Sequence, residues 1–500
     1  MLVLTGPLPT YSVLQSFAAG GRGAATVLRG AAQLETRTAQ AAANEMYIEL
    51  FIVRGDKGVG RRFAARRRKR EVNSPIVSQA NQAYDPPMKA PVMSAILTAA
   101  CAASGAGAAP FQKTLISVQQ NLRIDACEIS GSDVTPSSPD WSVKKFTLHG
   151  GKQEGVDVVI VNNGKLTFTV VPTRGMNVLS VTSGDVRLGW DSPVKEVVNP
   201  RHINLQSRGG LGWLEGFNEW LARCGLESNG HPGTDKFINN VGEEATMELT
   251  LHGKIANIPA SEVEVIVDPK PPYRIRLRGQ VDERMFYGPK LELKTEISTE
   301  PGSNSFRVSD VVTNRGGQEQ EYELLYHTNY GRPLLEEGST FLAAVSRVTP
   351  FNAHAASEIS QYSKYAGPTP GYVEEVYCLR PIADKDGRTV IALRNKAKDR
   401  AVSLTFSVKD LPYVTLWKNT NVEAEGYVTG LEPGVNFPSN RRIERKYGRV
   451  PKLFPGETHS ATIDFAILAS AEETQRLADE IAAIQGDIKP VIDQEPEKRD

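Results

Sequence analysis

From about residue 115 onward, the chain consists of short runs in which apolar and polar residues alternate. The runs KLTFTV (165–170), YRIRLRG (273–279) and KLELKTEI (290–297) each place apolar side chains at every second position. Successive side chains of a β-strand point to opposite faces, so each run predicts a strand with one buried and one solvated face. Strands of this kind are typical of antiparallel sheets.

The spacing of these runs predicts one large β domain. Strand-like runs recur to about residue 467, and glycine, proline and asparagine mark the turns; Asn163-Gly164 predicts a hairpin turn. No internal repeat divides the chain. We therefore expect an all-β dominated fold, a large antiparallel β-sandwich over residues 112–470, preceded by a tail over residues 1–111.

The C-terminal residues 471–500 predict a different element. Ser470 followed by Glu473 forms a capping-box pattern, which predicts the start of a helix. Apolar residues at helical spacing follow, and Gly486 predicts where the helix ends. We expect a short helix that packs on the sandwich, and a Pro- and charge-rich end that frays. The apolar residues at helical spacing are Leu477, Ile481 and Ile484.

Charge is balanced over the whole chain and uneven along it. The 58 lysines and arginines match 58 aspartates and glutamates, so no net charge attracts nucleic acid. Residues 1–92 hold 13 basic and 6 acidic residues, an excess centred on RRFAARRRKR (61–70). We interpret this segment as a disordered solvated tail, or as sequence upstream of the true start codon. A nucleic-acid-binding arm is the alternative.

A second start is indicated at Met88. The segment MKAPVMSAILTAACAASGAGAAPF (88–111) has one lysine, a weakly apolar stretch and small residues that fit a cleavage site. This is the layout of a secretory signal peptide. If translation starts near Met88, we expect an exported or periplasmic protein, and otherwise a cytoplasmic one.

Several functional classes lack their sequence features. No run of 18 apolar residues is present, which excludes a membrane-spanning helix. The 4 cysteines form no C-x-x-C pair, which excludes a disulfide scaffold and a cysteine zinc site. Walker, G-x-G-x-x-G, H-E-x-x-H and G-x-S-x-G motifs are missing, so phosphate-binding, zincin and serine-hydrolase functions have no support.

Some segments carry more Trp, Gly, His and Asn than strand packing needs. Aromatic faces stack on the apolar C–H faces of a sugar, while amide, carboxylate and guanidinium groups bind its hydroxyls. The composition of these segments therefore favours a small sugar or sugar derivative as the ligand. The segments are PTRGMNV (172–178), LGWDSP (188–193), GGLGWLEGFNEWLARCGLESNGHPG (209–233), LHGKIANIPA (251–260), LYHTNYG (325–331), GPTPGYVEEVYCL (367–379), LWKN (416–419) and GLEPGVNFPSNRR (430–442).

The order of these segments resembles the galactose mutarotase (aldose 1-epimerase) superfamily. YGPKLELKTEIS, LLYHTNYG, LEPGVNFP and FPGETHSATIDF are similar to its Y-P-G-x-L strand, N-H-x-Y-F-N motif, L-E-P motif and closing P-G-E-x-Y strand. The motifs R-G-M, L-G-W-x-S-P and R-C-G-L-E-S-N-G are closer to a branch of uncharacterised aldose-epimerase-like proteins. The resemblance covers residues 115–470 and implies a galactose mutarotase-like sandwich.

The resemblance also implies roles for four residues. Glu432 stands at the general base that takes the proton of the anomeric hydroxyl, and His327 at the general acid that protonates the ring oxygen. His252 matches a second histidine that binds the sugar, and Glu374 matches a sugar-binding aspartate. The chain departs from the family in this Glu, in Tyr326 where the motif has Asn, and in lacking the family's Asn-Arg clamp. These departures leave the identity of the sugar open.

Four further residues are expected to contact the substrate. Arg174 and Trp190 lie in the early segments, Asn329 follows His327 on the same strand, and Lys418 lies in LWKN. Arg174 could instead bind backbone carbonyl groups in the core. Convergence of several cations would favour an acidic sugar such as a uronate. The cations in question are Arg174, Arg223, Lys418 and Arg441.

Three functions remain in competition at this point. We expect anomer interconversion; the alternatives are a carbohydrate-binding protein without turnover, and a lyase or isomerase that uses the same cleft. A metal site formed by His252, His327 and Glu432 is disfavoured by their wide separation in the chain, and no metal or organic cofactor is expected. The oligomeric state stays open. The aromatic residues whose helical spacing fits a core as well as a sugar platform are Trp213, Phe217 and Trp220.

Overall fold

The computed structural model describes residues 109–499, and the first strand, β1, begins at Phe111. This start is one residue from the domain boundary expected from the sequence. The basic tail 1–92 and the proposed signal segment up to residue 108 lie outside the described residues. Within residues 109–499, no helix has the length and apolarity needed to cross a bilayer.

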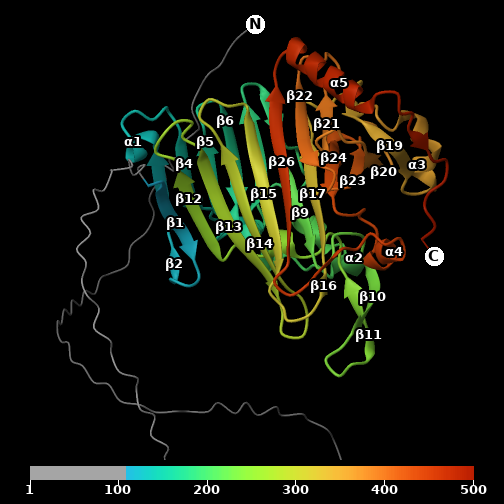
Figure 1. Cartoon of the computed structure of the whole chain (residues 1–500), viewed down its shortest axis with the longest axis horizontal. Helices are drawn as coiled ribbons and strands as arrows, with labels where there is room; N and C mark the ends of the chain where they lie inside the picture. The colour runs from blue at the N-terminus through green and yellow to red at the C-terminus, as the bar shows by residue number, and fades with distance from the viewer. Residues whose placement is uncertain (1–108, 500) are drawn as a thin grey trace, which may run out of the picture. The chain divides into compact units, whose positions relative to one another are not determined.

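Two large antiparallel sheets dominate the described chain, as Figure 1 shows, and the predicted all-β sandwich is confirmed. Among the described residues, the first sheet has 10 strands, in the order β18 (Thr340–Ala343), β21 (Arg388–Arg394), β22 (Ala401–Ser407), β26 (Thr458–Leu468), β15 (Ser305–Asn314), β14 (Lys290–Thr299), β13 (Ile275–Arg284), β12 (Glu262–Val267), β1 (Phe111–Ser117) and β2 (Leu122–Arg123). The second has 13, in the order β27 (Val491–Ile492), β19 (Val345–Pro350), β20 (Glu375–Pro381), β23 (Tyr413–Asn419), β24 (Val428–Gly434), β17 (Glu323–Tyr330), β9 (Leu221–Leu226), β7 (Asn177–Ser183), β6 (Leu166–Val171), β5 (Asp157–Asn162), β4 (Ser142–Thr147) and β3 (Cys127–Ser130), with β8 (Val186–Leu188) beside β7.

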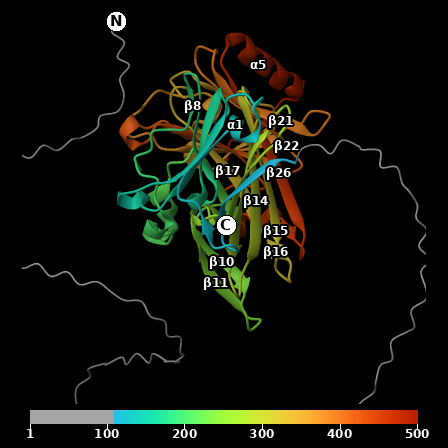
Figure 2. The same cartoon turned by 90° about the vertical axis from the view of Figure 1, so that its left-hand side faces the viewer.

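Smaller elements connect these strands. The hairpin of β10 (Gly233–Ile238) and β11 (Glu244–Leu249) projects beyond the sandwich, at the end opposite the C-terminal helix in Figure 2. A second short pair joins β16 (Gln320–Glu321) and β25 (Lys452–Leu453). The helices are α1 (Gly131–Val134), α2 (Ser207–Gly210), α3 (Ala353–Ser357), α4 (Arg441–Lys446) and α5 (Ala471–Gln485), and the 3-10 turns are η1 (Gly151–Gln153), η2 (Pro172–Arg174), η3 (Pro200–His202), η4 (Gly212–Gly216), η5 (Ile255–Asn257), η6 (Ile359–Gln361) and η7 (Glu423–Glu425).

The strands predicted from alternation are present. The runs at 165–170, 273–279 and 290–297 correspond to β6, β13 and β14, and β13 alternates between buried and partly exposed residues along its length. The Asn163-Gly164 hairpin joins β5 to β6. Gly164 has a φ of 91°, and the Asn163 side chain accepts hydrogen bonds from the backbone of Lys165 and Leu166.

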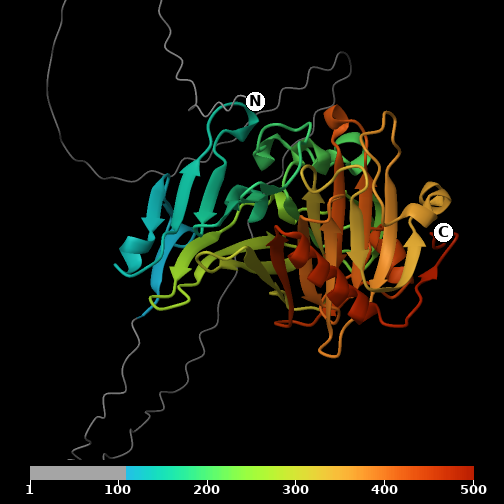
Figure 3. The ribbon, with the colours of Figure 1, turned by 90° about the horizontal axis from the view of Figure 1, so that it is seen from above.

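The predicted C-terminal helix is α5, and Figure 3 shows it lying against strands of the sandwich. Ser470 is its N-cap, and the apolar side of the helix packs on a small cluster that includes Val390 and Ala392 of β21. The residues after α5 differ from the frayed end that was expected. Val491–Ile492 pair in parallel with β19, and Thr349 Oγ1 donates a hydrogen bond to Asp493 at 2.6 Å.

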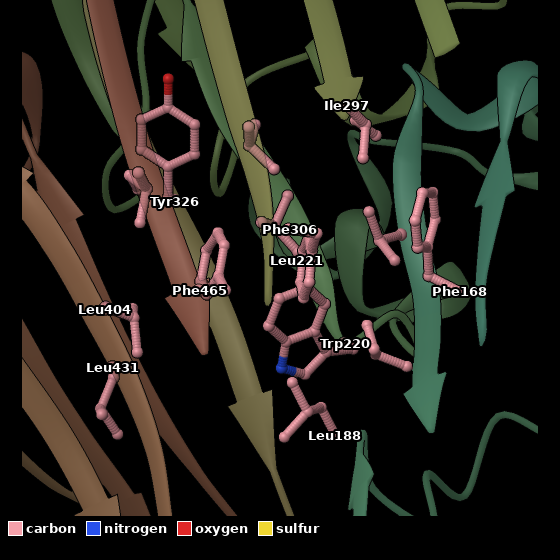
Figure 4. Packing of buried hydrophobic residues seen from close by; sticks show 14 of the residues in the cluster. Phe168, Leu188, Trp220, Leu221, Ile297, Phe306, Tyr326, Leu404, Leu431 and Phe465 are labelled. Atoms are coloured by element: carbon pink, nitrogen blue, oxygen red, sulfur yellow. The ribbon is translucent and has the colours of Figure 1, made fainter. Parts of the chain in front are cut away.

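The main core lies between the two sheets, and Figure 4 shows its packing. Trp220 lies at its centre, with its ring 5.0 Å from Phe465 and 5.5 Å from Phe306. Tyr326 of β17 and Leu431 of β24 reach this core from the second sheet. Since side chains alternate along a strand, their neighbours on β17 and β24 must point to the opposite face of that sheet.

That opposite face is covered as well. Every residue of β17 and of β24 is buried. The cover is a second apolar cluster, which includes Trp190 and Trp213 from the loops and Leu325 from β17. A strand buried on both faces can hold polar side chains only where they are paired, so polar residues on this covered face need a specific explanation.

A buried ion pair joins the two sheets directly behind these strands. Arg223 of β9 donates from Nη2 to Asp310 of β15 at 3.1 Å and to Thr295 Oγ1 of β14 at 2.7 Å. Its Nη1 donates to the backbone oxygen of Met176 at 2.9 Å. Neither charged side chain of the pair is exposed. Each member depends on the other, because an isolated buried charge is strongly unfavourable.

Replacing one member should therefore destabilise the fold. We expect Asp310→Asn to lower the free energy of unfolding by about 3–5 kcal/mol, since it leaves the Arg223 guanidinium buried without a counter-charge. Urea unfolding followed by circular dichroism measures this. Asp464→Asn is the matched control, because Asp464 on the neighbouring strand binds the exposed Arg307. The control should cost about 1 kcal/mol or less. Equal losses in both variants would contradict the role given to the pair.

Candidate functional site

Two titratable side chains meet on the covered face of the second sheet. His327 lies on β17 and Glu432 on the adjacent strand β24, where Thr328 pairs with Leu431. His327 Nε2 is 3.2 Å from Glu432 Oε1, and the two side chains are only 6% and 2% exposed. The structure thus brings together the two residues predicted as acid and base, although 104 positions separate them in the sequence.

Burial controls the protonation of this pair. It raises the pKa of Glu432 well above that of a free carboxyl group, and the charge of Glu374 adds to the effect. Burial likewise lowers the pKa of His327 well below its usual value, and His252 adds to that shift. Both shifts favour the neutral forms, because a low-dielectric environment penalises charge. Both shifts therefore favour a pair that holds one proton, with that proton on Glu432.

Gly430 has no side chain, and this leaves room for the contact between His327 and Glu432. It lies two residues before Glu432 on β24, so it shares the face of the sheet that carries the carboxylate. A Cβ atom at Gly430 would lie 2.4 Å from Glu432 Oε1 and 3.3 Å from the His327 ring. Any larger residue would displace the carboxylate, which gives a steric reason for glycine in GLEPG.

Aromatic rings surround His327. The ring centroid of His327 is 5.9 Å from Trp213, 5.3 Å from Phe217 and 5.5 Å from Trp417. Trp190 packs behind Phe217, with the two rings 4.9 Å apart. We call Trp190, Trp213, Phe217 and Trp417 the aromatic wall. Trp213 and Phe217 thus belong to the site, whereas Trp220 belongs to the main core.

His252 is the third polar residue of this site. Its ring is 5.2 Å from that of His327 and 4.6 Å from Trp213. Its Nδ1 is 2.9 Å from the backbone oxygen of Asn229, and burial lowers its pKa to about 4. A Cβ atom at Gly253 would lie 2.0 Å from the backbone oxygen of Ser228, so the His-Gly sequence reflects close packing of two chain segments.

Glu374 lies at the edge of the site and is exposed. It accepts a hydrogen bond of 2.8 Å from Trp417 Nε1, which ties this carboxylate to the aromatic wall. Asn329 lies deeper and is completely buried behind His327. Its Nδ2 donates to the backbone oxygen atoms of Glu219 and His327, and its side chain opposes the lowering of the pKa of His327.

The structure places Arg174 away from the acid-base pair. Its side chain is completely buried, and its Nε donates to Glu219 at 2.8 Å. The same guanidinium binds Asn257 Oδ1 at 2.7 Å and the backbone oxygen of Gly216 at 3.0 Å. Arg174 therefore holds chain segments together in the core, which is the alternative that the sequence left open. Its N–H groups are already bound within the protein and are not free to bind a substrate.

Lys418 points to the wrong face for a substrate residue. It neighbours Trp417 on β23, so the two side chains point to opposite faces of the sheet. Its Nζ binds Glu375 at 2.7 Å and lies over the rings of Tyr365 and Tyr377. The expectation that Lys418 binds substrate is thus not supported by its geometry. Trp417, not Lys418, points to the face that carries His327, and the alternation of Leu416, Trp417 and Lys418 along the strand was the signal for it.

The cations considered for a uronate do not converge. Arg223 and Arg441 are buried and bind Asp310 and Asp235 within the protein. Together with the pairs of Arg174 and Lys418, all four are neutralised by internal carboxylates. Their geometry removes the argument for an acidic sugar. The described residues also contain no cluster of His, Cys, Asp and Glu able to hold a metal ion.

A groove of about 1460 Å³ lies next to this region. It runs between the β10–β11 hairpin and the turn after β13, and Gly253 and Lys254 form part of its wall. His327 and Glu432 do not line it. The pair of His327 and Glu432 instead lies against the aromatic wall.

The lowered pKa of His252 makes a prediction about stability. Its pKa is about 4 in the folded protein and about 6.5 when unfolded, so acid protonates the unfolded chain first. Stability should therefore be lost as the pH falls from about 6.5 to 4, by about 3 kcal/mol from this residue. Urea unfolding between pH 7 and pH 4 measures it. His252→Gln should lose correspondingly less over the same range, and an identical loss would contradict the assignment.

Comparison with known proteins agrees with this architecture. The family model "Domain of unknown function (DUF4432)" matches residues 153–467. A structure of a provisionally assigned aldose 1-epimerase from Klebsiella pneumoniae is 41% identical, covers 78% of this chain and 100% of its own, and has a TM-score of 0.74. A galactose mutarotase-like protein from Clostridium acetobutylicum is 13% identical, covers 65% of this chain and 98% of its own, and has a TM-score of 0.45.

A galactose 1-epimerase from Lactobacillus acidophilus is 9% identical, covers 66% of this chain and 99% of its own, and has a TM-score of 0.41. No functionally curated protein matches the sequence. The family model spans more than half of the chain, and the Klebsiella protein aligns over its whole length. The chain belongs to the DUF4432 family, within the galactose mutarotase-like superfamily that its motifs resemble.

Proposed function

We propose that the protein interconverts the anomers of a free sugar, as an aldose 1-epimerase-like enzyme without a metal or organic cofactor. The observation that carries this proposal is the buried pair of His327 and Glu432, 3.2 Å apart beside an aromatic wall. Mutarotation needs one proton removed from a pyranose and one delivered to it. The 41% identical Klebsiella protein, assigned provisionally as an aldose 1-epimerase, adds support.

In the proposed reaction, Glu432 and His327 act on two oxygen atoms of one sugar. The Glu432 carboxylate takes the proton of the anomeric hydroxyl, while protonated His327 gives its proton to the ring oxygen. The bond between the anomeric carbon and the ring oxygen breaks, and an open-chain aldehyde forms. After rotation about the bond between C1 and C2, both transfers run backwards and close the ring as the other anomer. No proton is gained or lost overall.

One shared proton serves both directions. Ring opening starts with the proton on His327, and ring closure starts with the proton on Glu432. These are two forms of the same singly protonated pair, and the two side chains exchange their roles through the substrate that they flank. Burial favours the neutral form with the proton on Glu432. Sugar hydroxyls that bind the carboxylate favour the ionised form.

The surrounding residues fit the binding of a sugar. The aromatic wall offers apolar faces to the C–H face of a pyranose, and Trp417 is the member of the wall that is tied to the rim carboxylate Glu374. We assign hydrogen bonds with sugar hydroxyls to His252 and Glu374. Trp190 supports Phe217 from behind, and Asn329 supports His327. Arg174 and Lys418 lie outside this binding role.

Replacing the carboxylate should stop turnover and spare binding. We expect Glu432→Gln to slow anomer exchange by a factor of about 10²–10⁴, because the amide cannot take the hydroxyl proton. Polarimetry or NMR exchange on freshly dissolved aldoses, deoxy sugars and uronates measures the rate. Glu423→Gln, an exposed carboxylate of η7 paired with Arg332, is the control and should keep the parent rate. Saturable binding with no exchange in the parent would favour a carbohydrate-binding protein.

The shared proton also makes a prediction about pH. Exchange should follow a bell-shaped profile, because only the singly protonated pair is active. Its acid limb should lie below pH 6.5, since burial lowers the pKa of His327, and its alkaline limb well above pH 4.5, since burial raises the pKa of Glu432. Initial rates from pH 4 to pH 10 measure both limbs. An acid limb at or above pH 6.5, or an alkaline limb near pH 4.5, would contradict this scheme.

A further inference from the structure

A polar network lies behind His252, in a region that the proposed mechanism does not use. Its centre is Glu323, the first residue of β17, which is completely buried. One oxygen of Glu323 accepts a hydrogen bond from the backbone N–H of Asn229 at 2.9 Å, and the other accepts one from Asn436 Nδ2. Asn229 Nδ2 in turn donates to Asn436 Oδ1 at 2.8 Å. These contacts hold the backbone of residue 229 in place.

That backbone sets the tautomer of His252. The carbonyl oxygen of Asn229 is 2.9 Å from His252 Nδ1. A carbonyl oxygen can only accept, so Nδ1 must carry the proton. A neutral imidazole with its proton on Nδ1 has a free lone pair on Nε2. His252 can therefore accept a hydrogen bond from a ligand through Nε2, and cannot donate one there.

The network and the acid-base pair share two chain segments. β17 carries both Glu323 and His327, which are four residues apart and thus on the same face of the sheet. The LEPGVN sequence carries both Glu432 and Asn436, again four residues apart. A shift of β17 would move His327 directly and His252 through Glu323 and Asn229.

We propose that Glu323 is a positioning residue of this site: through Asn229 it fixes His252 with its proton on Nδ1, so that Nε2 accepts a hydrogen bond from one sugar hydroxyl. This rests on the proposed epimerase function. Glu323 touches neither the sugar nor the reacting atoms. Its effect passes through the backbone and is specific for a single hydroxyl group of the substrate.

The test pairs protein variants with substrates that each lack one hydroxyl. In the parent, removing the hydroxyl bound by His252 should lower kcat/KM by roughly tenfold, the usual size of one such hydrogen bond. Glu323→Gln keeps the size of the side chain and replaces one accepting oxygen by NH₂, which faces a donor. In that variant, removing this one hydroxyl from the substrate should lower kcat/KM by about twofold or less. Penalties for the other hydroxyls should stay as in the parent.

A matched variant separates positioning from simple loss of stability. Glu283 is also a buried carboxylate, and it accepts hydrogen bonds from the backbone N–H groups of Leu226 and Glu227 in the same segment. Glu283→Gln should lower stability. The loss of kcat/KM on removing each hydroxyl should stay as in the parent. If Glu323→Gln lowers kcat/KM equally for every sugar, its role is only structural and the proposal is overturned.

A second measurement uses the folded parent protein and needs no turnover. The ¹⁵N shifts of the His252 ring, assigned by their loss in His252→Gln, report which nitrogen carries the proton. The proposal requires protonation on Nδ1, and protonation on Nε2 would overturn it. If no sugar is turned over while Nδ1 is protonated, the proposed function fails and the positioning of His252 stands.

Discussion

The buried contact of Arg223 with Asp310 determines which side chains reach the site. It joins β9 of one sheet to β15 of the other, and it needs Arg223 to point into the space between the sheets. Its neighbours along β9 then point to the other face, as does His327, which pairs with Ala222. A slip of one residue would turn every side chain of the strand over. It would also leave both charges buried without partners, so the ion pair fixes the strand register on which the acid-base pair depends.

Charge is distributed in a consistent way around this register. The buried arginines and Lys418 each bind a carboxylate, and they lie behind or beside the site strands. The space around His327 and Glu432 is left with aromatic rings, with His252, which burial keeps neutral, and with one carboxylate at the rim. Low polarity in this region lowers the pKa of His327 and raises the pKa of Glu432. The same residues that exclude charge thus favour the neutral forms of His327 and Glu432.

The sequence predicted the sandwich, its strands and its terminal helix, because alternation and capping are local signals. It also predicted that Glu432 and His327 meet, but only through resemblance to a family, since no spacing rule connects residues so far apart. The sequence predicted the binding partners of the lysines and arginines less well. A charged residue in a motif segment can bind a ligand or a buried carboxylate, and nothing in PTRGM indicates that Arg174 binds Glu219. The network of Glu323, Asn229 and Asn436 depends on three distant segments, so it could not be derived from any one of them.

The position of β26 determines when the first sheet can be completed during synthesis of the chain. β26 lies inside the first sheet, between β15 and β22, although it is the last long strand to be synthesised. Until residue 468 has left the ribosome, both of those strands present open edges, and open edges pair readily with other chains. The first sheet can therefore close only after β26 has been synthesised. The edge of β15 is thus open from the synthesis of Asn314 until that of Leu468, and the edge of β22 from that of Ser407, so both edges need protection during this interval.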